Sequence, residues 1–189
     1  LCRIFGVELD VTALDLDKPT DDFTQGPAMS EAEFAAAFAA GAAALPDDAD
    51  LLCVGEMGIG NTTAAAAVCL GLYGGSGAEW AGPGTGLAAD GVSLKAQVIE
   101  LAVAANGVDP ADGLGVLRAL GGRELAAMAG AVAAARHKKV PVLLDGFVSG
   151  AAAACLERAA SGALDHCRAA HRSAEPGHDQ LLGKLGLRP

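Results

Sequence analysis

Short apolar runs separated by longer stretches of helical character give the first indication of the fold. Residues 50–54 and 140–144 are mostly apolar and are bounded by turn residues, which is typical of buried strands. Residues 164–170 form a weaker run of the same kind. Strands that alternate with helices predict an α/β fold, in which a parallel sheet is covered by Ala-rich helices on both faces.

The stretches between these runs carry helix signals. Ser30 and Glu33 form a capping-box pattern that predicts a helix to about Leu45. The sequence predicts further helices over residues 62–70, 88–105, 110–120, 123–137, 149–160 and 180–185. Apolar residues alternate with polar ones over residues 6–16, which predicts one more strand. Residues 18–29 and 73–86 are rich in polar residues or glycine, and we expect them to be loops.

Composition limits the classes of protein that fit. The 189 residues are 52% hydrophobic and 19% charged, which excludes a disordered chain and predicts a single domain over 1–189. The net charge of −10 leaves no basic surface for nucleic acid and no polybasic patch for a membrane. We find no run that predicts a membrane span or a signal peptide. The five cysteines are widely spaced in mostly apolar surroundings, so we expect buried, reduced thiols in a cytoplasmic protein.

Three polar segments follow the three predicted buried strands: 55–63, 145–149 and 171–178. In open parallel sheets, ligands bind beyond the carboxyl ends of the strands. The convergence of these segments therefore predicts one ligand site at that edge of the sheet.

The first of these segments has the character of an anion site. Three glycines, Gly55, Gly58 and Gly60, expose backbone amides, and Thr62 or Thr63 begins a helix whose N-terminus favours a phosphate. A tight strand–helix turn without a ligand is the alternative. The segment is not a P-loop, because Gly-Lys-Ser/Thr is absent, and it lacks the third glycine of the dinucleotide fingerprint.

Several side chains near this segment have candidate roles. Glu56 is placed to meet ribose hydroxyls or to transfer a proton, and the alternative is an exposed loop charge. Asp145 is likewise placed to meet ribose hydroxyls, and the alternative is a cap on the next helix. Residues 80–86 form a second glycine loop, and Lys95 in the following helix has apolar neighbours, which suits a reach toward a phosphate. His166, Cys167, His171 and Asp165 fit no zinc spacing, and Ser149 only partly fits a nucleophile elbow. We predict no metal and no cofactor.

Taken together, these loops resemble one family, the nicotinate-nucleotide–dimethylbenzimidazole phosphoribosyltransferases. The resemblance is carried in the family's order by residues 22–30, 55–63, 82–86, 144–147 and 171–178. The string Gly-Glu-Met-Gly-Ile-Gly-Asn-Thr-Thr at 55–63 is the most specific of them.

The resemblance implies a Rossmann-like homodimer that transfers ribose 5-phosphate from nicotinate mononucleotide to 5,6-dimethylbenzimidazole, giving α-ribazole 5′-phosphate and nicotinate for the lower ligand of cobalamin. It implies that Glu56 is catalytic, close to the reacting sugar. It also implies that substrate is bound by Gly55, Met57, Gly58, Ile59, Gly60, Asn61, Thr62, Gly84, Thr85, Lys95, Asp145 and Ser173.

The chain also departs from the family pattern. We expect it to lack the N-terminal part, which supplies much of the benzimidazole pocket, and the C-terminal Gly-Glu-Gly-Ser-Gly-type segment with the glutamate that deprotonates the base. Ala170 stands where a small hydroxyl residue is expected. The alternative function is therefore a non-catalytic nucleotide-binding or partner-binding fragment. A nicotinamide-dependent oxidoreductase is disfavoured by the missing third glycine and by the missing ribose-binding acid downstream.

Overall fold

A computed structural model describes residues 2–189 and contains a small parallel sheet. Its strands are β1 (Leu52–Val54), β2 (Val142–Leu144) and β3 (Cys167–Ala169), in the order β1-β2-β3. Leu52 pairs with Val142, and Val142 pairs with Cys167, so the three strands begin at one level and end at one edge. The α/β class and the parallel sheet predicted from the apolar runs are confirmed.

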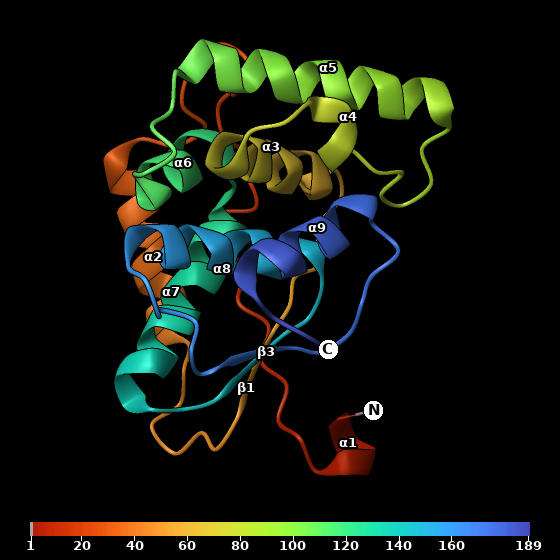
Figure 1. The fold of residues 1–189 in the computed structure, drawn as a ribbon. Coiled ribbons are helices and arrows are strands. Elements are labelled where there is room, and N and C mark those ends of the chain that lie inside the picture. The colour runs from red at the N-terminus through yellow and green to blue at the C-terminus, as the bar shows by residue number, and fades with distance from the viewer. Residues whose placement is uncertain (1) are drawn as a thin grey trace.

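Helices make up most of the described chain, and they lie in layers over the sheet (Figure 1). Helix α8 lies over the strands, α3 packs on α8, and α5 packs on the outer side of α3. The helices are α1 (Cys2–Phe5), α2 (Glu31–Ala43), α3 (Asn61–Tyr73), α4 (Gly77–Trp80), α5 (Ala89–Asn106), α6 (Gly113–Leu120), α7 (Arg123–Lys138), α8 (Phe147–Ala159) and α9 (Pro176–Leu185).

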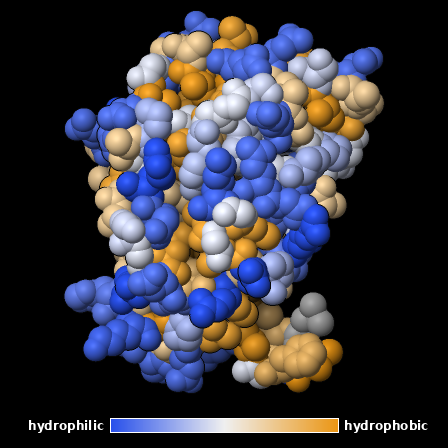
Figure 2. Space-filling model, viewed as in Figure 1, coloured by the Kyte–Doolittle hydropathy of each residue, from blue (hydrophilic) through white to orange (hydrophobic). Residues whose placement is uncertain are grey.

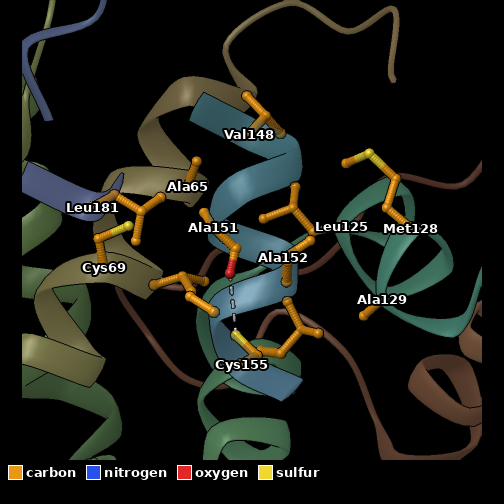
Figure 3. Packing of buried hydrophobic residues seen from close by; sticks show 14 of the residues in the cluster. Ala65, Cys69, Leu125, Met128, Ala129, Val148, Ala151, Ala152, Cys155 and Leu181 are labelled. Atoms are coloured by element: carbon orange, nitrogen blue, oxygen red, sulfur yellow. Dashed lines mark hydrogen bonds between the residues drawn. The ribbon is translucent and has the colours of Figure 1, made fainter. Parts of the chain in front are cut away.

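The core is centred on α8. Figure 3 shows Ala151, Ala152 and Cys155 of α8 between side chains of α3 and those of α7. Every residue of α8 from 147 to 156 is buried. Burial raises the pKa of the Cys155 thiol, so its S–H form persists and donates to the carbonyl oxygen of Ala151 at 3.5 Å. Alanine dominates this core because its small side chain lets helix backbones approach closely.

The contact between α2 and α7 is the closest of these approaches. A Cβ atom on Gly41 would lie 1.8 Å from the carbonyl oxygen of Ala127, and one on Gly130 would lie 1.9 Å from that of Phe38. Both distances are far below van der Waals contact. The two helix backbones therefore touch at positions that only glycine can fill.

An ionic cluster holds the start of α2 to α7. The predicted capping box is present, with the Glu33 amide donating to Ser30 Oγ at 3.3 Å. The Glu33 carboxylate also accepts from Lys18 Nζ at 2.6 Å and from Arg123 Nη2 at 3.0 Å. The hydrogen bond from Lys18, together with those from Ser30, lowers the pKa of Glu33 to about 2. This carboxylate thus joins the loop before α2 to the first turn of α7.

The structure differs from the expectation of helical cover on both faces of the sheet. Along β3, Cys167 and Ala169 are buried while Arg168 between them is exposed, and Cys53 of β1 is likewise exposed. Among residues 2–189, the helices therefore pack on one face only. The apolar strand runs predicted two covered faces because the sequence does not show whether an apolar residue such as Cys53 is buried or exposed.

Two local expectations were wrong. The strand predicted over residues 6–16 is not formed in the described chain, and Val7, Leu9 and Val11 are 54%, 74% and 80% exposed. Alternation alone does not make a strand, since a strand also needs a paired neighbour and a core face. Residues 73–86, expected as a loop, contain the short helix α4, which is fixed by burial of Trp80 and by its indole N–H donating to Gly74 at 2.9 Å.

Two further expectations concern the burial of the cysteines and the absence of a membrane-spanning helix. The described cysteines are all free; Cys69, Cys155 and Cys167 are buried, as expected, whereas Cys53 is exposed. Over residues 2–189, no helix has the length and apolar character needed to cross a membrane.

The α2–α7 contact yields a test of the fold. We expect Gly130→Ala to lower the free energy of unfolding by about 1–3 kcal/mol, because the new methyl group forces the two backbones apart. Urea denaturation measures the change. Gly183→Ala in α9 is the matched control, since its new methyl group meets nothing within 4 Å and we expect it to be neutral or stabilising. A Gly130→Ala protein as stable as the parent would contradict the contact.

Candidate active site

A cavity of ≈ 170 Å³ opens at the carboxyl edge of the sheet. All three of the polar segments that follow the strands contribute to it, as predicted from their positions after the carboxyl ends of the strands. The cavity is lined by Gly55, Glu56, Thr62, Asp145, Gly146, Phe147, Val148, Ser149, His171, Ser173 and Glu175.

The glycine loop between β1 and α3 is held by its own glutamate. Glu56 Oε2 accepts from the amide of Gly58 at 2.7 Å and from the side-chain amide of Asn61. Both bonds go to one oxygen, so Oε1 is available to a ligand. A Cβ on Gly58 would lie 2.6 Å from Asn61 Nδ2, so a larger residue at this position would push the Asn61 side chain away from Glu56.

Helix α3 begins directly beside the cavity. Its N-cap is Gly60, whose φ of 84° lies in the left-handed region that favours glycine, and no side chain among residues 2–189 caps the helix. Thr62, in the first turn, lines the cavity and is half-buried. The positive end of a helix of 13 residues therefore faces this site with its first amides uncapped by a side chain of the described chain.

Lys95 reaches the same place from α5. Its side chain is only 5% exposed, and its Nζ donates to Thr62 Oγ1 at 2.8 Å and to the carbonyl oxygen of Gly82 at 3.0 Å. Burial lowers the pKa of Lys95, and the charge of Glu175 opposes this effect. Lys95 is thus a buried cation that contacts the cavity lining through the hydroxyl of Thr62.

Glu175 joins the second glycine loop to the cavity. Its Oε1 accepts from the amide of Gly84 at 2.8 Å, whereas its Oε2 is buried with no hydrogen-bond partner among the described residues. A Cβ on Gly84 would lie 3.0 Å from Thr62 Oγ1, so this loop packs against the start of α3. Sequence reasoning missed Glu175, because its only local signal is its place inside a polar segment.

Asp145 lies at the end of β2, opposite the glycine loop. A Cβ on Gly55 would lie 3.8 Å from Asp145 Cβ, and Asp145 Oδ1 is 3.7 Å from His171 Nδ1. The Ser173 hydroxyl, from the same segment as His171, is buried without a partner among the described residues. The site therefore brings three carboxylates, those of Glu56, Asp145 and Glu175, to one cavity together with a histidine and an unpartnered hydroxyl.

Ser149 acts as a structural residue. Its hydroxyl accepts from the amide of Gly146 and donates to the carbonyl oxygen of the same residue, both at 3.0 Å. This arrangement closes the first turn of α8 and leaves no hydroxyl hydrogen for a base. Among residues 2–189, no group of three or more His, Cys, Asp or Glu side chains is arranged to hold a metal ion.

The predicted site residues divide into three groups. Gly55, Glu56, Thr62, Asp145 and Ser173 line the cavity, and Gly58, Gly60, Asn61, Gly84 and Lys95 adjoin these lining residues. Met57 and Ile59 are 103% and 93% exposed at the tip of the glycine loop, and Thr85 is exposed outside the cavity lining. The roles of all these residues remain predictions.

Comparisons with known proteins agree on one family. The model of the family described as "Phosphoribosyltransferase" matches residues 1–189. A protein of Ruegeria sp. (strain TM1040) named nicotinate-nucleotide–dimethylbenzimidazole phosphoribosyltransferase is 56% identical over 189 residues, which is 100% of this chain and 56% of that protein. A protein of the same name from Cereibacter sphaeroides (strain ATCC 17025) is 54% identical over the same shares.

A solved structure extends the similarity to three dimensions. The crystal structure of CobT from Thermus thermophilus superposes with a TM-score of 0.84 at 40% sequence identity, covering 90% of this chain and 52% of that one. The chain thus spans about half the length of the relatives it matches.

Glu124 yields a test of the electrostatics near the site. Burial raises the pKa of Glu124, and the charge of Glu56 adds to the effect. Because the pKa of Glu124 is higher in the folded state than its unfolded value of 4.5, the protonated carboxyl group stabilises the fold at low pH. This stabilisation is fully present below pH 4.5 and is lost as the pH rises through the folded pKa. We therefore expect Glu124→Gln to raise the free energy of unfolding at pH 7.

Urea denaturation between pH 3.5 and pH 7.5 measures this effect. The gain should disappear below about pH 4, where Glu124 itself is neutral. Glu8→Gln, in the exposed segment before α2, serves as the control for loss of one negative charge. A destabilised Glu124→Gln protein at pH 7 would contradict the assignment.

Proposed function

The chain belongs to the nicotinate-nucleotide–dimethylbenzimidazole phosphoribosyltransferase family, and we propose that its cavity binds the phosphoribosyl group of nicotinate mononucleotide for transfer to 5,6-dimethylbenzimidazole. The observation that carries the proposal is the joint placement of an uncapped helix N-terminus, a buried lysine and the carboxylates of Glu56 and Asp145 around one cavity.

The proposed reaction is a displacement at the anomeric carbon of the ribose. A nitrogen of the benzimidazole forms a bond to C1′ as the bond from C1′ to the nicotinate nitrogen breaks. The electron pair of the broken bond stays with nicotinate, and the other ring nitrogen of the benzimidazole loses its proton to water. Attack from the face opposite the leaving group converts the β-nucleotide to an α-product.

The phosphate has a natural place at the start of α3. Uncapped backbone amides and the positive end of the helix favour an anion there. Lys95 supplies a cation near these amides, and its low exposure keeps its charge from being screened by water. The Ser173 hydroxyl has no partner among the described residues, so it can donate to an oxygen of the ligand.

The ribose then lies between the carboxylates of Glu56 and Asp145. Glu56 offers its free Oε1, and Asp145 lies opposite it across Gly55. Either carboxylate can accept from a ribose hydroxyl. Both also favour the positive charge that develops on the sugar as the bond to nicotinate breaks. This arrangement gives Glu56 a role close to the reacting carbon.

The size of the cavity limits what the described residues can bind. Its volume of ≈ 170 Å³ is below the ~300–1,000 Å³ of typical small-molecule sites. We therefore assign it to the phosphoribosyl group alone, with the benzimidazole bound elsewhere in the assembly. The same observation supports a second candidate, a nucleotide-binding unit that does not catalyse transfer by itself.

We also propose that the protein acts as a homodimer in the cytoplasm and without a cofactor. Ile4, Phe5 and Leu9 are exposed near α1, where Figure 2 shows apolar surface at the foot of the molecule. Burial of such surface in a partner copy would stabilise a dimer. The free cysteines support a reducing compartment.

Turnover tests the proposed function directly. We expect the chain, incubated with nicotinate mononucleotide and dimethylbenzimidazole, to form α-ribazole 5′-phosphate detectable by chromatography. Glu56→Gln should lower the rate by about 10²-fold or more, because it removes a charge beside the reacting carbon. Binding of nicotinate mononucleotide without product would favour the nucleotide-binding unit. A folded chain that neither binds nor turns over would refute both.

Lys95 tests the phosphate site separately. We expect Lys95→Met to weaken binding of nicotinate mononucleotide by about 10- to 100-fold, the effect of losing one charged hydrogen bond. Methionine suits the buried position of the lysine stem, so the fold should persist. Calorimetric titration gives the affinity, and Lys139→Met at the exposed end of α7 is the control. Equal affinities for the parent and for Lys95→Met would exclude Lys95 from the phosphate site.

A further inference from the structure

His178 is a buried polar residue behind the cavity, and the proposed chemistry does not use it. It lies in the first turn of α9 and is 2% exposed. Its Nδ1 accepts from the backbone amide of Ser173 at 3.0 Å, and its own amide donates to the carbonyl oxygen of Glu175, also at 3.0 Å. Residues 173–178 are thus closed into a short loop by two bonds, one to the imidazole of His178 and one from its backbone amide.

That loop carries part of the cavity wall. Ser173 and Glu175 both line the cavity, and Glu175 in turn holds the second glycine loop through the amide of Gly84. Pro176 and Gly177 then connect the wall to His178 itself. The imidazole therefore fixes Ser173 directly, whereas Glu175 is held by the His178 amide and by Gly84.

The surroundings of the ring leave it little freedom. Its centroid lies 6.4 Å from the ring of Phe147 and 6.3 Å from the ring of His171, to which it stands edge-on. A Cβ on Gly150 of α8 would lie 3.9 Å from its Nε2. The buried ring is thus enclosed by Phe147, His171 and the side of α8, which favours one direction for its bond to Ser173.

We propose that His178 is a positioning residue: in its neutral form it holds residues 171–175 against the cavity, and its protonation releases them. The bond requires an unprotonated Nδ1, because a protonated nitrogen is a donor and would face the donor of Ser173. The consequence for nicotinate mononucleotide rests on the proposed function, whereas the effect on the loop does not.

The charged groups around the ring fit this behaviour. Burial lowers the pKa of His178, and neighbouring His171 lowers it further, whereas Asp179 on the same helix and Asp145 at the end of β2 oppose the shift. The side chains of α8 that meet the ring are uncharged. A lowered folded-state pKa means that the contribution to stability is present above the unfolded value of 6.5 and is lost as the pH falls through the folded pKa.

Two variants separate the hydrogen bond from the titration. His178→Asn places an amide oxygen on the same Cγ as the imidazole Nδ1, so it can accept from Ser173 at any pH. His178→Leu fills similar space and accepts nothing. His137→Asn is the matched control, since His137 is exposed at the end of α7.

The first measurement needs no ligand. By NMR on the free chain, we expect the Ser173 amide to be protected from hydrogen exchange at pH 7.5 and the His178 ring to carry its proton on Nε2. The protection factor should fall about tenfold in His178→Leu, the worth of one hydrogen bond. It should fall likewise in the parent as the pH drops below the His178 pKa, but not in His178→Asn.

The second measurement follows the affinity for nicotinate mononucleotide from pH 7.5 to pH 5. We expect the parent and His137→Asn to lose affinity as His178 protonates, and His178→Asn to keep a flatter profile. Full Ser173 protection in His178→Leu, or an unchanged low-pH loss of protection in His178→Asn, would overturn the proposal. If His178→Leu does not fold, the pH profile of His178→Asn decides. Absence of binding at pH 7.5 beside a protected Ser173 amide counts against the proposed function alone.

Discussion

Leu52, Val142 and Cys167 start three neighbouring strands at the same level of the sheet, and the site depends on this parallel register. Each strand is only three residues long, and the register brings chain segments that leave the sheet at residues 54, 144 and 169 to a single edge. Gly55 and Asp145 follow two of these strands directly, and the segment from His171 follows the third. A shift of one residue in any pairing would turn alternate side chains to the other face and displace that segment from the cavity.

The scaffold behind this edge is built from small side chains. Alanine and glycine let α8 lie between α3 and α7, and they let α2 and α7 touch along their backbones. Alanine and glycine have few side-chain rotamers to order on folding, and their close packing leaves the helices little room to move. It suits a site whose loops carry the function, because the rigid helices fix where each loop begins and ends.

Much of the arrangement could be predicted from local patterns. The apolar runs located β1 and β2, the capping box located α2, and the polar segments after the strands located the cavity. The strand expected over residues 6–16 was wrong because alternation does not reveal whether a pairing partner exists. Cys53 was expected to be buried because apolar character does not specify a face. Glu175 and His178 were missed because their importance lies in bonds to residues that only the fold brings close.

The backbone contact between α2 and α7 also has a consequence for synthesis on the ribosome. Gly41 and its partner Ala127 are about 85 residues apart, which at roughly 5–20 residues per second separates their emergence by several seconds. During that interval α2 has no partner for its glycine face, and Glu33 lacks the guanidinium of Arg123. The segment around α2 therefore cannot complete its packing until α7 has been made, and β1 and α3 wait longer still, because their partners β2 and α8 follow α7 in the chain.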